Sequence, residues 1–316
     1  MTTEPSLPPF RFGVQCSSPP DITATRWREL ARKVEDLGYY RLTVSDHLDD
    51  QLSPVAALMA AADATSTLRV GALVFCNDYR HPAVLAKEAA TLDILSEGRF
   101  ELGLGAGWMT SDYEAAGIPM DTPGVRIARL EEAIHVVTGL LSDGPCTFAG
   151  EHYRIDGLSG SPKPVQQPIP LLVGGGGRKV LELAGRHAHI VGLNPKLPNG
   201  VIDAAAGPDA TAASTERKIG WVRDAAGDRF SEIELHTRIH LAMVTDDRMT
   251  VAEAVAPAMG LSVEESLDTP HALCGTVDEI VADLLARRER FGIASIGLSL
   301  DALDAFAPVV AALAGR

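Results

Sequence analysis

Cysteine is scarce in this sequence, and basic residues are outnumbered by acidic ones. The chain of 316 residues has 4 cysteines, and none of them shows the Cys-x-x-Cys spacing of a structural zinc site. We expect no metal site, and free thiols in a reducing cytoplasm. The 42 acidic and 28 basic residues leave a net charge of −14. This charge argues against nucleic acid or an anionic membrane as a partner, because both attract basic surfaces.

Long apolar runs are also missing. The sequence contains no stretch of about 20 apolar residues, the length that crosses a bilayer, and no apolar segment typical of a secretory signal. We therefore expect no membrane partner. The first nine residues, MTTEPSLPP, are predicted to be a flexible lead-in.

Hydrophobic residues make up 46% of the chain, enough for a large core. The pattern alternates buried-type strands with amphipathic helices, which predicts a (β/α)8 barrel in a single domain spanning 1–316. The length fits such a barrel with insertions. The expected strands are 10–16, 40–44, 68–76, 99–104, 169–173, 189–193, 234–244 and 295–300.

Between these strands, we expect helices over 24–37, 53–65, 82–97, 127–141, 178–184, 215–226, 249–259, 277–290 and 304–314. Asp21 or Thr23 is the expected cap of the first helix. Three segments read as insertions outside the barrel pattern: a polar loop at 108–124 that could cover a ligand, a hairpin at 147–155, and a mobile stretch at 195–213 rich in Pro, Gly, Ala and Asp.

The segment 68–107 carries the most functional information. It reads as strand, helix and strand, with Pro82 in the first helical turn and Gly98 at the helix end. Polar residues or glycines follow the carboxyl end of each strand. In parallel α/β folds, this is the edge where ligands bind.

This segment resembles the luciferase-like monooxygenase superfamily, and within it the branch that uses the deazaflavin coenzyme F420. The resemblance is carried by YRHPAVLAKE at 79–88, TLD at 91–93 and GRFELGLGAGW at 98–108, and it extends from about residue 10 to about residue 298. It implies a bacterial luciferase-like barrel that holds a flavin-type ring inside its C-terminal rim. It also implies an oxidoreductase acting on a small organic substrate, commonly as a homodimer.

Asp46 and His47 follow the second strand. A histidine can exchange a proton near neutral pH, as hydride transfer to or from an alcohol carbon requires. The resemblance implies that this pair contacts the deazaflavin, with His47 as the base. Asp46 could fix the tautomer of His47 if the two side chains meet. The alternative is a capping aspartate beside a partly buried histidine.

The third strand ends near Leu73, Val74 and Asn77. Relatives have a non-proline cis peptide here that forms a bulge behind the ring, and the resemblance places it at Leu73–Val74. Asn77 would then bond the polar edge of the ring. The alternative for Asn77 is a loop side chain that satisfies its own backbone.

Four glycines, Gly174, Gly175, Gly176 and Gly177, lead directly into a helix that begins with Arg178. Backbone N–H groups in such a loop can point at a phosphate, and the helix N-terminus favours negative charge. In the family, this loop holds the cofactor phosphate. Arg178 would supply a counter-charge. The alternative is a flexible turn.

Gly105, Ala106 and Gly107 end the fourth strand, and small residues there would let a flat ring approach the backbone. Trp108 either lines the substrate side or anchors the following loop. In F420-dependent glucose-6-phosphate dehydrogenases the position of Trp108 is a glutamate, and a tryptophan stands at the position of Gln51. Both departures argue against that sugar phosphate as the substrate.

Cys16 and Cys76 lie at strand ends, so they either face the substrate pocket or pack as small residues. The sequence identifies neither the substrate nor the direction of the reaction. It leaves three possibilities: an F420-dependent oxidoreductase, an FMN-dependent monooxygenase, and a protein that binds a flavin or deazaflavin without turnover.

Overall fold

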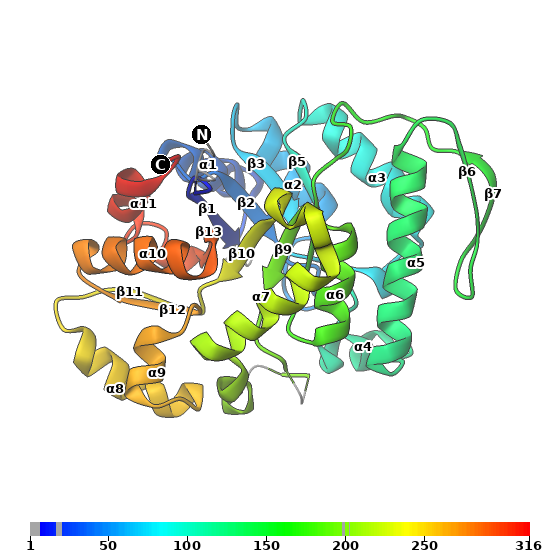
Figure 1. Ribbon diagram of the computed structural model, residues 1–316. Coiled ribbons are helices and arrows are strands. Elements are labelled where there is room, and N and C mark those ends of the chain that lie inside the picture. Colours follow the sequence, from blue (N-terminus) through cyan, green and yellow to red (C-terminus); the bar gives the residue numbers. More distant parts are fainter. Residues whose placement is uncertain (1–6, 17–20, 198–199, 202) are drawn as a thin grey trace, which may run out of the picture.

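The computed structural model describes residues 7–16, 21–197, 200–201 and 203–316. Its main sheet has the strand order β3-β2-β1-β13-β10-β9-β8-β5-β4, and an additional pairing of β3 with β5 closes the sheet into a barrel. All neighbouring strands in this sheet are parallel. Helices lie outside the strands (Figure 1). The predicted (β/α)8 barrel is confirmed.

Each barrel strand falls on a predicted segment, although β5, β8 and β13 extend one or two residues beyond it. Most of the strand residues are buried because helices cover them outside and side chains fill the interior. Their bounds are β1 (Arg11–Cys16), β2 (Arg41–Val44), β3 (Arg69–Ala72), β5 (Phe100–Gly105), β8 (Leu171–Gly175), β9 (Ile190–Leu193), β10 (Glu234–Arg238) and β13 (Ile293–Ser299).

The predicted strand 68–76 is interrupted. A cis peptide joins Leu73 to Val74, at the place that the resemblance indicates. The chain then resumes as β4 (Phe75–Cys76), which pairs with the end of β5 through Phe75 and Leu104. The bulge therefore sits at the C-terminal edge of the barrel.

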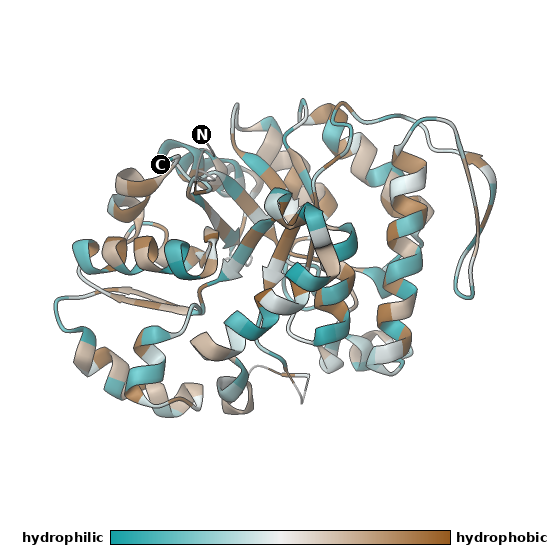
Figure 2. Ribbon diagram, viewed as in Figure 1, coloured by the Kyte–Doolittle hydropathy of each residue, from teal (hydrophilic) through white to brown (hydrophobic). Residues whose placement is uncertain are grey.

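The outer helices follow the predicted apolar periodicity, and α10, for example, buries Ile280, Leu284 and Phe291. Figure 2 shows hydrophobic and hydrophilic colours alternating along α5 and α10, as in helices with one face on a sheet. Thr23, not Asp21, caps α1 by accepting from the Arg26 N–H. The bounds are α1 (Ala24–Asp36), α2 (Pro54–Asp63), α3 (Pro82–Leu95), α5 (Pro123–Leu141), α6 (Arg178–His187), α7 (Ala212–Ala226), α8 (Arg248–Met259), α10 (Val277–Phe291) and α11 (Ala307–Leu313).

Two predictions, one about a loop and one about a strand, are wrong. The polar loop 108–124 contains a helix, α4 (Thr110–Ala116), whose end is fixed by Gly117 in a left-handed conformation. The predicted strand 234–244 divides into β10 and β11 (Leu241–Val244), because β11 leaves the barrel to pair with β12 (Ala272–Gly275). The sequence patterns predicted neither β12 nor α9 (Val263–Asp268), although Ser262 and Glu265 form a capping box at the start of α9.

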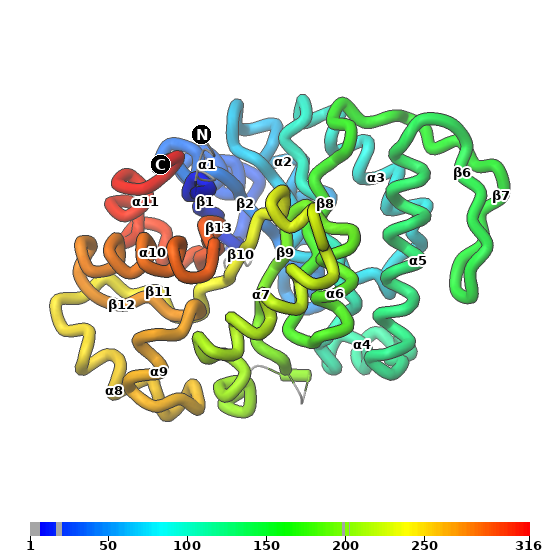
Figure 3. The backbone as a smooth tube through the Cα atoms, viewed as in Figure 1, coloured from blue at the N-terminus to red at the C-terminus, as the bar shows by residue number. Residues whose placement is uncertain are grey.

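The predicted hairpin outside the barrel is confirmed as β6 (Pro145–Ala149) and β7 (Arg154–Ser159), which pair antiparallel. Figure 3 shows it projecting from the body beside α5. The 3₁₀ helices are η1 (Asn77–Tyr79), η2 (Ala204–Asp209), η3 (Gly227–Glu232) and η4 (Leu300–Ala302).

The segment after β9 is tied to the barrel by a buried lysine. Lys218 of α7 has no exposed side-chain surface; its Nζ lies 2.7 Å from Asp209 Oδ2 and donates to the carbonyl of Asn194 at 2.9 Å. The expected mobile stretch 195–213 is thus anchored at Asp209. Residues 198–199 and 202 of this stretch, and 1–6 of the expected lead-in, lie outside the described residues.

Candidate active site at the C-terminal rim

The expected site residues gather at one end of the barrel because parallel strands bring their carboxyl ends together. His47 lies beyond β2, Asn77 beyond β4, Trp108 beyond β5, and Gly177 beyond β8. The structure therefore places four separate segments of the predicted site on the same rim.

His47 is held by two neighbours. Its Nδ1 lies 2.7 Å from Asp112 Oδ2, and its ring meets the Trp108 ring edge-on, with centroids 5.5 Å apart. The side chain of His47 stays 18% exposed. Because Nδ1 is engaged, Nε2 is the ring nitrogen available to a ligand. Trp108 thus contacts His47 and begins the connection to α4; both roles expected for it stay predictions.

Asp112 is a site residue that the sequence analysis missed. It lies on α4, its side chain is 5% exposed, and it also accepts from the Tyr79 hydroxyl at 3.2 Å. No sequence signal links it to His47, because 65 positions separate the two and the segment carrying it read as a loop. If a helix had been predicted at 110–116, Asp112 would have stood out as an acidic residue in its first turn.

Asp46 has a different partner from the one expected. Its carboxylate accepts two hydrogen bonds from Arg80, at 2.8 and 3.1 Å, and one from the Cys76 N–H at 2.9 Å. The suggestion that Asp46 fixes the tautomer of His47 is therefore wrong; Asp112 holds that place. Asp46 instead ties β2 to the chain that follows the cis peptide.

The glycines of β5 make room for the bulge. A Cβ on Gly105 would lie 2.5 Å from Val74 Cγ2, and one on Gly103 would lie 1.9 Å from the Ala72 carbonyl oxygen. A Cβ on Gly107, whose φ is +76°, would lie 1.9 Å from the Tyr113 hydroxyl oxygen. Packing within the protein therefore favours glycine at 105 and 107 by itself, and their expected role of admitting a flat ring stays a prediction.

Two side-chain amides, the buried one of Asn77 and the half-buried one of Gln15, flank the Leu73–Val74 bulge. Asn77 donates to the Tyr153 hydroxyl at 3.2 Å, and Gln15 donates to the Leu73 carbonyl at 3.4 Å. The oxygens Asn77 Oδ1 and Gln15 Oε1 are buried without a hydrogen-bond partner in the part of the chain that the structure describes. Buried acceptors of this kind are normally satisfied, so the pair fits a ligand with N–H groups. Gln15 was not predicted.

The four glycines after β8 differ in their surroundings. Cβ atoms on Gly175 and Gly176 would lie 2.4 Å from Val180 and 2.5 Å from the Lys196 backbone nitrogen, so packing requires both glycines. Cβ atoms added to Gly174 and Gly177 would have no neighbouring atom closer than 3.5 Å. Gly177 is the N-cap of α6. There is therefore room beside the start of α6 at Gly177, and a helix N-terminus favours an anion.

The charges near this helix start also differ from expectation. Arg178 donates to Glu182 at 2.7 Å and its side chain is 69% exposed, on the outer surface. The Cε atom of Lys196, by contrast, lies 3.8 Å from the position of a Cβ on Gly177. Lys196 is therefore better placed than Arg178 to meet an anion. It lies beyond β9, in a segment that sequence reasoning treated as an insertion.

Both cysteines at strand ends are packed. Cys16 is 1% exposed within the core, and burial raises the pKa of its thiol to about 12. Cys76 is 7% exposed, with its sulfur 3.5 Å from the Tyr113 hydroxyl. Their surroundings agree with packed small residues, the alternative to lining a substrate pocket.

Arg238 is a further rim residue without a sequence signal. It ends β10 and donates from Nη2 to the Ser299 hydroxyl at 3.0 Å. Its Nη1 is buried and has no hydrogen-bond partner among the described residues. A donor in this state suits an acceptor on a bound molecule.

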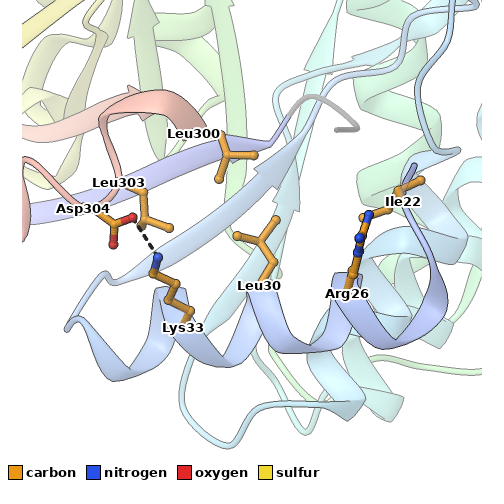
Figure 4. A pocket seen from close by; sticks show the side chains of 7 residues that line it. All are labelled: Ile22, Arg26, Leu30, Lys33, Leu300, Leu303 and Asp304. Carbon is orange, nitrogen blue, oxygen red and sulfur yellow. Dashed lines mark hydrogen bonds and ion pairs between the residues drawn. The ribbon is translucent and has the colours of Figure 1, made fainter. Parts of the chain in front are cut away.

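A separate cavity of about 290 Å³ lies between α1 and the chain after β13. Figure 4 shows Lys33 and Asp304 paired at one end and Arg26 near Ile22 at the other. None of the predicted site residues lines it. Within the described residues, no helix has the length and apolarity to cross a membrane, and no cluster of three or more His, Cys, Asp or Glu side chains could hold a metal ion.

The fold and the rim define a class: a parallel (β/α)8 barrel with a bulged third strand, a histidine beyond the second strand and a glycine-rich helix start beyond β8. This combination is what the resemblance to luciferase-like proteins implies. The luciferase-like monooxygenase family profile matches residues 7–295. The chain belongs to this family.

Relatives in the family use more than one cofactor. The chain is 28% identical over 279 residues to an F420-dependent glucose-6-phosphate dehydrogenase of Nakamurella multipartita, covering 83% of this chain and 78% of the relative. It is 33% identical over 165 residues to an FMNH(2)-dependent dimethylsulfone monooxygenase of Pseudomonas fluorescens, covering 50% and 45%. Among solved structures, the coenzyme F420 dependent tetrahydromethanopterin reductase of Methanopyrus kandleri has the same fold, with a TM-score of 0.76 over 96% of this chain and 98% of that one at 20% identity.

Proposed function

We propose that this protein is an F420-dependent oxidoreductase that transfers a hydride between the deazaflavin and a small organic substrate. The observation that carries the proposal is the partly exposed His47 on the rim, with Nδ1 engaged and Nε2 available. Similarity to an F420-dependent dehydrogenase over most of both chains supports the choice of cofactor.

The described residues fit this cofactor. The unpartnered oxygens of Asn77 and Gln15 would accept from N–H groups of the ring. The start of α6 at Gly177, with Lys196 beside it, would hold the phosphate. The bulge at Leu73–Val74 would support the ring from behind.

When bound, F420 would supply a hydride from C5 of its reduced ring, or take one up there when it is oxidised. His47 would donate the accompanying proton from Nε2 when the substrate is reduced, and accept it at Nε2 when the substrate is oxidised, as a general acid or base. Trp108 limits the freedom of the His47 ring and shields one side of it. The buried amides and the helix start bind and orient the cofactor, so that the substrate meets His47 on the open part of the rim.

Glucose 6-phosphate is not the proposed substrate. Trp108 occupies the place where the resemblance implies a glutamate in the sugar-phosphate enzymes. Gln51, in place of their tryptophan, pairs with the Ser45 hydroxyl. An alcohol, a carbonyl or an unsaturated carbon suits the chemistry. We further propose that the protein works as a single catalytic domain, as a homodimer in the cytoplasm.

The second candidate is an FMN-dependent monooxygenase, favoured by the similarity to the dimethylsulfone enzyme. The two cofactors share the shape of the ring. Equilibrium binding of F420 and FMN in parallel, with the bound spectra recorded, separates the candidates. We expect F420 to bind at least about tenfold more tightly, a difference of about 1.4 kcal/mol. Equal affinity, or a preference for FMN, would overturn the proposal in favour of the monooxygenase. Binding of neither would remove both.

A further inference from the structure

The hydrogen-bond partner of an imidazole decides which of its two nitrogens carries the proton in the neutral ring. Nδ1 of His47 lies 2.7 Å from Asp112 Oδ2. An ionised carboxylate only accepts hydrogen bonds, so this contact places the proton on Nδ1. Nε2 is then left with a free lone pair.

Asp112 itself is held firmly. Its side chain is 5% exposed, and the same oxygen accepts from the Tyr79 hydroxyl at 3.2 Å. The neighbouring Tyr113 fastens α4 to the same stretch of chain by donating to Asp78 Oδ2 at 2.9 Å. The carboxylate therefore has a defined direction relative to the end of β4.

Two residues of the segment after β5 orient the His47 ring. Trp108 meets the imidazole edge-on at an interplanar angle of 87°, and Asp112 engages Nδ1 from the first turn of α4. One side chain sets the plane of the ring and the other sets its tautomer. Asp46, adjacent to His47 in sequence, is occupied by Arg80 and Cys76.

We propose that Asp112 is a positioning residue that keeps His47 in the Nδ1–H tautomer, so that Nε2 is the atom that exchanges the proton with the substrate. The proton-exchange part rests on the proposed function, whereas the tautomer does not depend on it.

The test is ¹⁵N NMR of the histidine rings in the full chain at about pH 8.5, where neutral imidazoles dominate. Comparison with His47→Gln identifies the His47 signals. We expect a pyrrole-type signal for Nδ1 and a pyridine-type signal for Nε2. In Asp112→Asn, the side-chain amide can donate to Nδ1, and the His47 tautomer should shift toward Nε2–H, the effect known for the equivalent substitution in serine proteases.

Glu114→Gln is the matched control, because it makes the same change in charge at an exposed position of the same helix. Its spectrum should equal that of the wild type. An Nε2–H tautomer in the wild type would overturn the inference, even if Asp112→Asn failed to fold. An unchanged tautomer in folded Asp112→Asn would overturn it as well.

Failure of the proposed function has a different signature. If the tautomer result holds but F420 does not bind, the cofactor proposal fails and the positioning role stands. If F420 binds but the tautomer is wrong, only the role of Asp112 fails. With an identified substrate, Asp112→Asn should slow hydride transfer at least about tenfold while F420 affinity stays within about threefold, because the residue acts through His47.

Discussion

His47 combines partial exposure with two contacts that orient its ring. Its ring contacts Trp108 edge-on and its Nδ1 is close to Asp112, yet 18% of the side-chain surface stays exposed to solvent. A surface histidine without a role gains little from two such contacts. A proton-exchanging group, by contrast, needs a ring whose free nitrogen has a set direction.

Replacing His47 by alanine tests this role. We expect His47→Ala to slow hydride transfer by about 10²-fold or more, the usual scale for losing a general acid or base. F420 affinity should change much less, because Asn77, Gln15 and Gly177 remain. Stopped-flow oxidation or reduction of bound F420 measures the step once a substrate is known. His135→Ala, an exposed histidine on α5, is the control; hydride transfer within a few-fold of the wild type would reduce His47 to shaping the pocket.

The phosphate loop offers a second test at the scale of one residue. Gly176 is a poor probe, because any side chain there collides with the chain at Pro195 and Lys196. Gly177→Val adds bulk where the nearest atom is 3.8 Å away, so the fold should survive. F420 should bind at least about tenfold more weakly, about 1.4 kcal/mol, in a titration monitored by absorbance.

The control for this variant is Gly220→Val on α7, where nothing lies within 4 Å of an added Cβ. It should leave the dissociation constant unchanged. If Gly177→Val binds F420 as tightly as the wild type does, the start of α6 is not the phosphate site.

Among the elements, the short β4 and the 3₁₀ helix η1 depend on one buried ion pair. The side chain of Asp46, just beyond β2, is 5% exposed, and Arg80, just beyond η1, donates a hydrogen bond to each of its oxygens. Arg80 also lies over the Phe75 ring at 4.9 Å. This arrangement holds the chain after the cis peptide against β2, and with it the buried amide of Asn77.

Arg80→Gln should therefore destabilise the fold by about 3–5 kcal/mol, because it leaves the Asp46 carboxylate buried without its cation. Arg178→Gln makes the same substitution in an exposed i,i+4 pair with Glu182, for which we expect less than about 1 kcal/mol. Urea unfolding followed by circular dichroism gives both values. Equally small effects would show that Arg80 is dispensable for this part of the rim.

At the scale of the whole molecule, the barrel interior contains ionisable groups. Arg41 is 2% exposed and lies 3.2 Å from Glu101 and 2.6 Å from Glu234. Burial by itself would raise the pKa of Glu234, but Arg41 and Arg11 lower it to about 2. Burial lowers the pKa of His236, on β10, to about 3. Outside the barrel, directly before β12, burial also lowers the pKa of His271 to about 3.

These shifts predict a loss of stability in acid. In the unfolded chain the histidines bind protons below about pH 6.5 and Glu234 binds one below about pH 4.5. In the folded chain His236 binds a proton only below about pH 3, and Glu234 only below about pH 2. The unfolded state thus binds more protons in these windows. The free energy of unfolding should fall from about pH 6.5 downward, by up to about 1.4 kcal/mol per pH unit for each buried histidine.

Urea unfolding at several pH values between about pH 7.5 and about pH 4.5 measures this slope. His236→Gln removes one of the groups and should make the slope shallower. A free energy of unfolding that stays constant over this range would contradict the prediction.

The sequence by itself determined the barrel, the family and the strand ends that form the rim. Local patterns carry this information: apolar periodicity marks each strand and helix, and Pro82 and Thr23 mark helix starts. Because strand ends of a parallel barrel share one edge, the approximate location of His47, Asn77 and Gly177 followed without any knowledge of contacts. The hairpin was predicted correctly from its local pattern. The site of the cis peptide was predicted correctly from the resemblance.

The tertiary structure alone decided which of these residues meet. Asp112 pairs with His47 across 65 positions, Arg80 takes Asp46 across 34, and Lys196 reaches Gly177 from beyond the next strand. Gly105 also has a packing role that its spacing did not predict, because the Val74 side chain occupies the space next to it. Such pairings depend on how helices and loops pack over the rim, and no local periodicity encodes that packing. The barrel could therefore be predicted from spacing, whereas the partners within the site required the folded chain.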